Sequence, residues 1–490
     1  MPVLATPRSR NLALALLAMT QFVVVIDGSI INVALPSIGS ALHIAEADLS
    51  WVVNAYALAF GGFLLLGGRL ADFLGRRRVF MTGIAIFTAA SLLGGFAQDP
   101  LLLDGARALQ GFGAALASPA ALSLITTIFP EGRERGRAFA VWGATAGAGG
   151  AAGVLLGGVL TQYLGWEWVL FVNVPLGAFI LWQAPLRLPA ARDTLERTRF
   201  DLAGAVLVTA GLATLVYAFV AANTDGWTSG WTWGRLGTAV VLLVAFVVVE
   251  RRSRSPLVPF SIFRLRNLRG GNVIGLLLGM ALNSMFFLLT LYLQRVLGFD
   301  ALQAGLAFLP LASSIVVASI VASQLIERIG AKATLTTALV CITAALAWFS
   351  RVHADGSFPV DTLGPSILVG LGFGGSLVAV TTIATNGVPE EETGLASGLV
   401  NASQQVGGAL GLAIVVSVAA SVTKHDGGVG PDALTAGYQT AFLVSAAIVL
   451  LGAILSVVVL TSTARRDTSD RTAAPAPERD AAPLSGSDAS

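Results

Sequence analysis

The sequence predicts an all-α polytopic membrane protein, and three observations lead to that prediction. Of the 490 residues, 55% are hydrophobic and only 12% are charged, whereas charged residues make up about 25% of an ordinary soluble domain. The mean hydropathy is +0.78. Apolar runs long enough to cross a bilayer recur along the chain from residue 12 to residue 460. These features exclude a string of soluble domains.

Net charge and cysteine content limit the possible partners and cofactors. A net charge of +2 gives no basis for binding nucleic acid, and we expect no nucleic-acid partner. The single cysteine, Cys341, lies inside an apolar run and cannot form an intrachain disulfide. We therefore expect Cys341 to be a small core residue, and we expect neither a metal site nor a redox cofactor.

Fourteen membrane-spanning helices are predicted when about 20 apolar residues are taken for each span. The first run contains Asp27 and is too long for the core of a signal peptide, so we expect it to be retained. The predicted spans are 12–34, 50–68, 79–97, 101–128, 138–161, 167–186, 202–222, 234–250, 270–293, 303–325, 332–350, 362–387, 395–420 and 438–460.

The basic residues predict the orientation of these spans. Alternate connections collect 25 Lys and Arg residues on one side and only four on the other, and Arg107 lies inside a span. Because basic connections stay in the cytoplasm, we expect both termini there. Arginine greatly outnumbers lysine, as in high-GC bacterial genomes, so we expect the plasma membrane of a bacterium. Residues 461–490 have no long apolar run, and we expect a disordered cytoplasmic tail.

A polar segment, GGRLADFLGRRRVF at residues 67–80, connects the second and third predicted spans. Its three consecutive arginines are typical of a charged turn that only fixes orientation. An acid and two glycines are not needed for that purpose. The segment resembles the signature of the loop between helices 2 and 3 in the major facilitator superfamily, and the match includes Gly68, Asp72, Gly75, Arg76 and Arg77. The resemblance implies that these residues form a conformational switch.

A weak internal repeat supports this resemblance. Residues 323–335, SQLIERIGAKATL, align with residues 68–80 at an offset of 255, with Gly330 in the place of Gly75 and Lys332 in the place of Arg77. Two six-helix bundles are therefore predicted, as in transporters built from parallel repeats. The expected division is 1–186 for the first bundle, 187–269 for two inserted helices with cytoplasmic linkers, and 270–460 for the second bundle. Fourteen spans resemble the larger drug:proton antiporter family of the superfamily.

The first span places an acid, Asp27, about halfway along an apolar helix. A carboxylate at that depth costs a few kcal/mol on insertion scales, so it must be protonated, paired or in contact with water. It could also be purely structural, neutralised and hydrogen-bonded to a neighbouring helix. The stretch 23–36 resembles the first-helix signature of the 14-span family, matching at Asp27, Asn32, Ala34, Leu35 and Pro36. We expect Asp27 to exchange protons during transport.

The fourth span carries Asp104 near its outer end and Arg107 one turn deeper. Residues at this spacing can form a local ion pair on one helix face. The alternative comes from resemblance, because Arg107, Gln110, Gly111 and Gly113 match the Arg-x-x-Gln-Gly-x-Gly signature of helix 4. The arginine of that signature is associated with proton coupling. The resemblance therefore implies a role in proton coupling for Arg107, and Asp104 beside it is the next candidate carboxylate after Asp27.

The fifth span is rich in glycine, which favours close helix packing. It resembles the antiporter signature Gly-Pro-x-x-Gly-Gly, matched by Gly153, Gly157 and Gly158. Val154 replaces the proline, which would kink the helix in that signature. This departure leaves open an importer or symporter of a small metabolite.

Aromatic and aliphatic side chains dominate the spans, so we expect an apolar cavity that suits a small hydrophobic or cationic molecule. The thirteenth span adds amides that either line this cavity or bond helix to helix. The candidate lining residues are Trp51, Tyr56, Phe286, Phe287, Asn401, Gln404 and Gln405.

Other classes of function fit less well. An ATP-driven pump needs a glycine-rich loop that ends in lysine, and neither lysine lies in one. An intramembrane enzyme needs paired acids, His or Cys at depth, but the histidines, His43, His353 and His425, fall in outer connections. We expect a monomeric, non-enzymatic exporter that uses the proton gradient rather than a cofactor. Two bundles would alternate in access around a central site.

Overall fold

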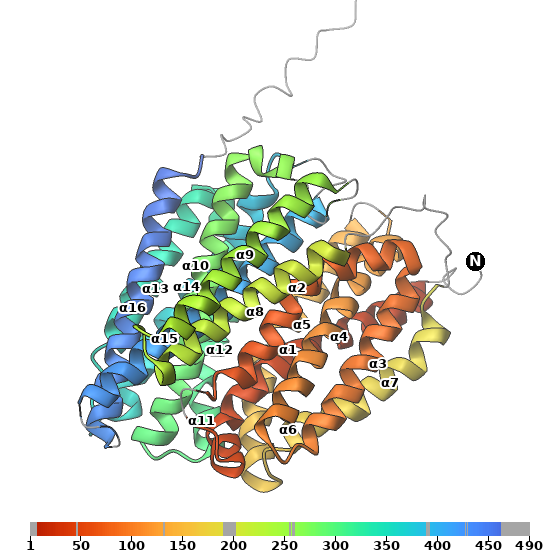
Figure 1. The fold of residues 1–490 in the computed structure, drawn as a ribbon. Helices are drawn as coiled ribbons and strands as arrows, with labels where there is room; N and C mark the ends of the chain where they lie inside the picture. Colours follow the sequence, from red (N-terminus) through yellow and green to blue (C-terminus); the bar gives the residue numbers. More distant parts are fainter. Residues whose placement is uncertain are drawn as a thin grey trace, which may run out of the picture.

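The structure, a computed structural model, is a bundle of long helices (Figure 1). It describes residues 7–45, 48–130, 133–189, 202–253, 256, 260–388, 393–426, 428 and 430–461. Regular secondary structure in these residues is helical throughout, without a β-strand. The all-α prediction is therefore confirmed.

The helices follow the predicted apolar runs and extend several of them. The first part of the chain forms α1 (Pro7–Leu42), α2 (Trp51–Leu74), α3 (Arg76–Gly95), α4 (Pro100–Ile128), α5 (Arg133–Tyr163), α6 (Trp168–Phe171), α7 (Asn173–Arg187), α8 (Leu202–Asp225) and α9 (Gly230–Arg252). The second part forms η1 (Phe260–Arg264), α10 (Arg266–Leu291), η2 (Tyr292–Val296), α11 (Ala301–Ala307), α12 (Leu309–Ile329), α13 (Ala331–Phe349), η3 (Phe358–Thr362), α14 (Leu363–Thr385), α15 (Thr393–His425) and α16 (Pro431–Val458).

Thirteen helical segments of the described residues are long and apolar enough to cross a membrane. They correspond to every predicted span except the second, for which α2 contains a shorter apolar stretch, Trp51–Leu64. The multi-pass prediction is confirmed, and the count of fourteen spans stays a prediction. The expectation of a disordered tail concerns residues that lie, from 462 onward, outside the described part of the chain.

Two of the predicted spans are interrupted. The span predicted at 167–186 consists of α6 and α7, which are separated at Val172. The span predicted at 303–325 consists of α11 and α12, which are separated at Phe308. Pro310 lies two residues after Phe308 and has no backbone N–H to continue the hydrogen bonding of α11, which explains the second interruption.

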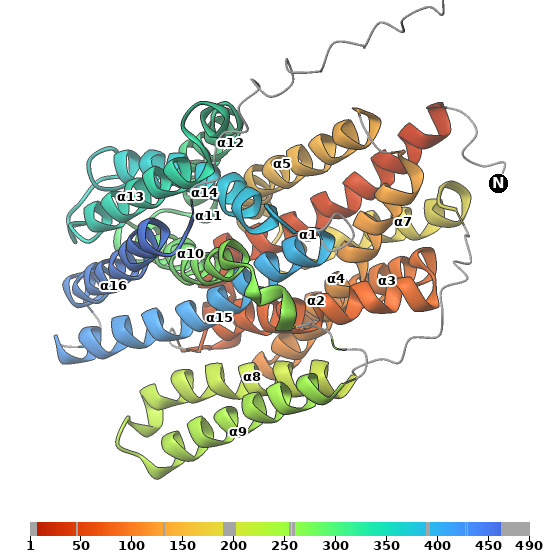
Figure 2. The ribbon, with the colours of Figure 1, turned by 90° about the horizontal axis from the view of Figure 1, so that it is seen from above.

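The helices form two groups with equivalent packing. Helices α1 to α7 lie on one side and α10 to α16 on the other (Figures 1 and 2). Helix α1 packs on α5 as α10 packs on α15, and α2 packs on α4 as α12 packs on α14. Helix α3 packs on α4 and α7, as α13 packs on α14 and α16. These matched pairs agree with the internal repeat.

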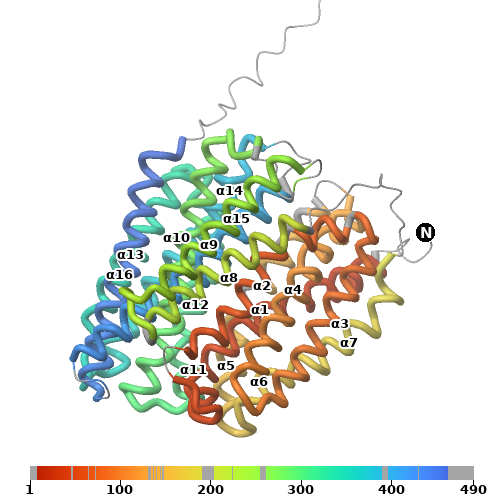
Figure 3. Tube along the Cα trace, viewed as in Figure 1, coloured from red at the N-terminus to blue at the C-terminus, as the bar shows by residue number. Residues whose placement is uncertain are grey.

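The remaining pair, α8 and α9, forms a hairpin beside α2 and α15, as the chain trace shows (Figures 2 and 3). The Ser417 hydroxyl of α15 donates to the Phe219 carbonyl of α8 over 3.1 Å. Helix α8 therefore contacts both groups at once. The apolar cluster that joins the three helices consists of Ala57, Leu58, Leu212, Val216, Val220, Ala409 and Ala413.

The two groups also contact each other directly, through α2 with α15 and through α5 with α11 and α12. Gly158 of α5 lies so close to the Ala301 carbonyl of α11 that a Cβ on Gly158 would be 2.7 Å from that oxygen. The Gln294 amide of η2 donates to the Val33 carbonyl of α1 over 2.8 Å. These contacts hold the two groups together in this conformation.

The glycine of the polar segment recurs in both groups with the same backbone role. Gly75 separates α2 from α3 with φ of 96°, and Gly330 separates α12 from α13 with φ of 85°. Only glycine adopts these angles at low cost. Next to each break a basic side chain caps a distant helix end: Arg77 donates to the Leu188 carbonyl over 3.2 Å, and Lys332 donates to the Val457 and Leu460 carbonyls over 2.8 Å. The sequence repeat therefore corresponds to a structural one.

Candidate functional site

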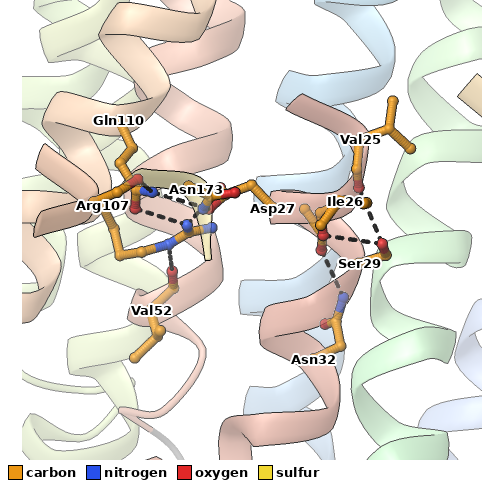
Figure 4. Close-up of polar contacts among 11 residues, drawn as sticks. Val25, Ile26, Asp27, Ser29, Asn32, Val52, Arg107, Gln110 and Asn173 are labelled. Atoms are coloured by element: carbon orange, nitrogen blue, oxygen red, sulfur yellow. Dashed lines mark hydrogen bonds and ion pairs between the residues drawn. The ribbon is translucent and has the colours of Figure 1, made fainter. Parts of the chain in front are cut away.

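Asp27 lies at the centre of a buried polar cluster. Its side chain is fully buried in α1, and Figure 4 shows it pointing toward side chains of α4 and α7. Arg107 Nη1 donates to Oδ2 over 2.7 Å, Gln110 Nε2 donates to Oδ1 over 2.9 Å, and Asn173 Nδ2 donates to Oδ1 over 2.7 Å. The carboxylate therefore has three hydrogen-bond donors in place of water.

Arg107 is also buried inside the protein, with a side-chain exposure of 1%. Its Nη1 donates to Gln110 Oε1 over 2.9 Å, and its Nε donates to the Val52 carbonyl of α2 over 3.0 Å. The guanidinium lies 4.6 Å from the centre of the Tyr56 ring, in a cation–π contact. These contacts orient the positive charge toward Asp27.

Gln110 connects the ion pair to a further helix. Its oxygen accepts from Arg107, and its nitrogen donates to Asp27 and to Ser91 Oγ of α3, the latter over 2.6 Å. Every hydrogen-bonding atom of the Gln110 amide is therefore engaged. The cluster as a whole draws on five helices, α1, α2, α3, α4 and α7.

The glycines of α4 allow the helices of the polar cluster to approach closely enough for these hydrogen bonds. A Cβ on Gly111 would overlap the Tyr56 carbonyl of α2, and a Cβ on Gly113 would lie 2.7 Å from the Gly83 carbonyl of α3. Larger residues would separate the helices and lengthen the polar contacts. The Arg-x-x-Gln-Gly-x-Gly pattern of α4 thus combines two side chains that bond Asp27 with two glycines that admit the neighbouring helices.

The buried ion pair is electrically balanced but costly to disturb. A pair removed from water is tolerated only when both charges have good partners, and removal of one partner leaves the other uncompensated. The ion pair found for Arg107 joins it to Asp27 of α1, rather than to Asp104 on its own helix. Asp104 lies one turn away on α4, and its Oδ1 is buried without a hydrogen-bond partner in the described part of the chain.

The glycines of α5 pack against α1 beside Asp27. A Cβ on Gly153 would overlap Ser29 Oγ, and a Cβ on Gly157 would lie 2.8 Å from the Ile30 carbonyl. The Ser29 hydroxyl donates within its own helix to the Val25 carbonyl over 3.0 Å, and the Asn32 amide donates to the Gly28 carbonyl over 2.9 Å (Figure 4). Gly158, by contrast, faces α11 in the other group.

The residues predicted as a conformational switch lie at the α2–α3 connection, apart from the polar cluster. Arg76 Nη1 donates to the Ser123 carbonyl over 3.3 Å and to Thr127 Oγ1 near the end of α4. Gly68 faces Pro119 of α4 at van der Waals distance. The prediction for the Asp72 side chain concerns a group outside those that the structure describes.

The predicted cavity residues have varied surroundings. Tyr56 is 6% exposed and lies against Arg107, and Phe287 is fully buried in the apolar core. Phe286 stacks on Phe308, with ring centres 5.8 Å apart, and Trp51 contacts Tyr217 of α8. Tyr56 and Phe287 therefore offer little surface to a ligand in this conformation.

The predicted cavity amides of α15 differ in their exposure and in their neighbours. Asn401 is exposed, whereas Gln404 and Gln405 are partly buried. The Gln404 backbone lies against Gly279 of α10, and the Gln405 Cβ lies beside Gly61 of α2. Gln405 is thus at the contact between the two groups of helices.

Sequence reasoning missed Asn173, Ser91 and the contact between Tyr56 and Arg107. A polar side chain inside a membrane span is a recognisable signal, and Asn173 is such a residue in the run 167–186. Its partner, however, is 146 residues away in the chain, so only the folded arrangement identifies its contact with Asp27.

In the described part of the chain, a histidine pairs with an acid in the loop between α13 and α14. His353 Nδ1 is 2.8 Å from Asp361 Oδ1, and the backbone N–H of Ser357 donates to Asp361 Oδ2 over 2.7 Å. The Tyr292 hydroxyl donates to the His353 carbonyl over 2.8 Å. These bonds fix the connection between α13 and α14, which is a structural role.

Similarity to solved structures agrees with the helical arrangement. The chain resembles a nucleoside transporter with a TM-score of 0.66 at 14% identity, covering 92% of this chain and all of the other. It resembles an auto-inhibited peptide transporter of the POT family with a TM-score of 0.67 at 16% identity, covering 94% and 99% of the two chains. At these identities the likeness concerns the fold alone.

Several relatives found by sequence have a higher sequence identity to this chain than these solved structures have. The chain is 42% identical to the puromycin resistance protein of Streptomyces alboniger, over 94% of this chain and 92% of the relative. It is also 42% identical to the cephamycin export protein of Amycolatopsis lactamdurans, over 91% and 92%. The lincomycin resistance protein of Streptomyces lincolnensis is 37% identical, over 93% and 92%. Residues 17–412 match the family model of the Major Facilitator Superfamily. The chain therefore belongs to the Major Facilitator Superfamily.

Proposed function

We propose that this protein exports hydrophobic or cationic drug molecules, antibiotics among them, in exchange for protons. Relatives at 37–42% identity are named for resistance to, or export of, puromycin, cephamycin and lincomycin. The observation that carries the proton-coupled part of the proposal is the buried contact of Asp27 with Arg107. Titratable groups inside membrane spans are usually retained for a function of this kind.

The cluster suggests how a proton and a substrate would compete. While Asp27 is ionised, Arg107, Gln110 and Asn173 all donate to it. A proton on Asp27 removes the negative charge, so Arg107 loses its counter-charge and the donors lose their acceptor. Substrate that binds better to the ionised form then expels the proton, and by linkage the proton weakens substrate binding to the same extent.

Movement of the two groups of helices would connect this exchange to transport. We propose that α1–α7 and α10–α16 rock as two bundles, with Gly75 and Gly330 at the breaks between helices of each bundle. The contacts of Gly158 with Ala301 and of Gln294 with Val33 would have to separate when access changes sides. The residues of the polar segment at 67–80, including Asp72, would favour one of the two states.

The proposal also covers the membrane in which the protein lies, its orientation and its oligomeric state. The asymmetric distribution of basic connections supports cytoplasmic termini and insertion into a bacterial plasma membrane. Major facilitator proteins are generally transporters rather than enzymes, and we propose that this chain is a monomeric, non-enzymatic transporter driven by the proton gradient, without a cofactor.

One observation favours a second candidate. Val154 stands where the antiporter signature has proline, and α5 runs as a helix from Arg133 to Tyr163 without a proline inside it. A symporter or importer of a small metabolite needs no kink at that position. Substrate would then move in the same direction as the proton rather than against it.

Dye transport distinguishes the two candidates. Cells that lack their own drug pumps and express this protein should expel ethidium, and an uncoupler should abolish the expulsion. Expression that leaves dye accumulation unchanged for several unrelated hydrophobic cations, or that increases it, would favour the importer. Membrane insertion should be verified in the same cells, so that an absent protein is not mistaken for an inactive one.

A further inference from the structure

Asn173 carries a role that no sequence motif assigned to it. We propose that its amide serves Asp27 in both protonation states: Nδ2 donates to the carboxylate, and after a half-turn of the amide Oδ1 accepts the hydrogen of the protonated acid. Asn173 is thus a positioning residue for the proton. The inference rests on the proposed function, in which Asp27 carries that proton.

Two features of the Asn173 amide support the proposal. Its nitrogen donates to Asp27 Oδ1 over 2.7 Å in a fully buried setting. Its oxygen is buried and has no hydrogen-bond partner in the part of the chain that the structure describes. A buried carbonyl oxygen without a partner is costly, so its presence beside a titratable acid calls for a function. Acceptance of the hydrogen of protonated Asp27 gives this oxygen a function.

The other members of the cluster cannot provide that acceptor. Arg107 has only donors. Gln110 has its oxygen occupied by Arg107 and its nitrogen occupied by Asp27 and Ser91, so a turn of its amide would break three bonds. The amide of Asn173 can turn at the expense of a single bond, the one to Asp27 itself. Because nitrogen and oxygen exchange places in the turn, the amide occupies the same volume in both states.

Few charged groups compete for the proton. The titratable or charged side chains that face Asp27 are Arg107, in direct contact, and Tyr56, whose ring lies under the guanidinium. Asp104 lies one turn before Arg107 on α4. The stretches of α3, α5 and α7 that pack nearby, residues 79–95, 142–162 and 173–186, contain no titratable or charged side chain. The proton on Asp27 therefore depends mainly on Arg107 and on the neutral amides.

The Tyr56 hydroxyl is the rival acceptor, because it too is buried without a hydrogen-bond partner among the described residues. The ring of Tyr56 is held by Arg107 and stacks on Phe60, with ring centres 5.9 Å apart. Its hydroxyl can accept as well as donate without any turn of the ring. The two residues are therefore compared directly in the test.

The test is infrared difference spectroscopy of the purified full-length protein in liposomes, titrated from alkaline to acidic pH. The carbonyl band of protonated Asp27 is the one that Asp27→Asn removes. Asn173→Leu, which keeps the side-chain size but neither donates nor accepts, should move this band to higher wavenumber, because the acid loses its acceptor. Asn173→Ser, whose hydroxyl can donate or accept, should restore part of the shift. Tyr56→Phe should leave the band in place.

Asn32→Leu is the matched control, because Asn32 is on the same helix as Asp27 but bonds to the Gly28 carbonyl instead. It should leave the band where it is. Asn173→Leu should also slow gradient-driven ethidium efflux roughly tenfold, the effect of about one lost hydrogen bond, with a smaller change in the concentration for half-maximal transport. If the leucine variant does not fold, Asn173→Ala removes the same two hydrogen bonds and replaces it.

The outcomes separate the two proposals. A band that titrates in the wild type but does not shift in the Asn173 variants, or that shifts in Tyr56→Phe instead, overturns the role of Asn173 and leaves Asp27 as the proton carrier. A wild-type protein without any titrating band assignable to Asp27 overturns the proposed coupling, and the role of Asn173 with it.

Discussion

The two groups of helices share a structural plan but differ in what they bury. Gly75 and Gly330 make the same break, and Arg77 and Lys332 cap equivalent helix ends. Yet the buried ion pair of α1 and α4 has no counterpart in α10 and α14, where residues 270–294 and 363–388 contain no charged side chain. The second group instead joins its helices by neutral contacts such as that of Ser403 with Asn272, 2.8 Å.

This difference distinguishes the features that the fold needs from those that it does not need. Backbone breaks and helix caps are needed wherever two membrane helices connect tightly, so they recur in both groups. A fully buried ion pair is not needed for the fold, because the described residues of the second group pack without one: their pair of His353 with Asp361 lies in a loop and has an exposed histidine. We therefore expect the charge inside the first group to serve transport rather than the fold.

Removal of one charge should have the largest effect. Arg107→Leu leaves Asp27 ionised and buried without its counter-charge, which should destabilise the protein by about 3–5 kcal/mol. Thermal unfolding in detergent measures the loss. Asp27→Leu combined with Arg107→Leu should recover most of that stability while remaining unable to couple transport to a gradient, as the neutral second group leads us to expect. A single variant as stable as the wild type would contradict the account of the cluster.

The paired glycines test whether the two breaks are equivalent. Gly75→Ala and Gly330→Ala each force a side chain into a backbone conformation that costs roughly 1–3 kcal/mol. We expect similar losses of thermal stability from both. Efflux should fall more in Gly75→Ala, because that break belongs to the segment that resembles the conformational switch. Unequal stability losses would show that the structural repeat is only approximate.

The paired basic caps should show the smallest effect. Arg77→Met and Lys332→Met each remove a cation from the carbonyls of a helix end, an interaction of about 0.3–1 kcal/mol. Unfolding temperatures should fall slightly and to a similar extent. An efflux defect in Lys332→Met that exceeds the one in Arg77→Met would argue against placing the switch in the first group.

The sequence predicted the spans well because hydrophobic length is a local property. It also predicted the repeat, because Gly330 and Lys332 preserve the backbone and capping requirements of Gly75 and Arg77. It located Asp27 and Arg107 through their depth in apolar runs and through resemblance. The interruptions at Val172 and Phe308 were missed, since an apolar run shows its length more clearly than its breaks.

Contacts between distant helices could not be predicted from the sequence. Arg107 has Asp104 three residues away, and the spacing suggested only that local partner, whereas its partner in the structure, Asp27, is 80 residues away. Asn173 gave the signal of a polar residue in a span, without an indication of its partner. Tyr56 and Phe287 were grouped as cavity residues by chemical type, whereas burial separates them: the first lies under a guanidinium and the second lies in the core.

Gradient-driven transport by Asp27→Asn is the most direct test of proton coupling through Asp27. The substitution keeps the size of the side chain and removes its ability to exchange a proton. In proteoliposomes with an imposed pH gradient, the wild type should move ethidium against its concentration gradient, whereas Asp27→Asn should only let ethidium equilibrate, at a rate that no longer depends on pH. Uphill transport by Asp27→Asn at the wild-type rate would contradict the account and direct attention to Asp104.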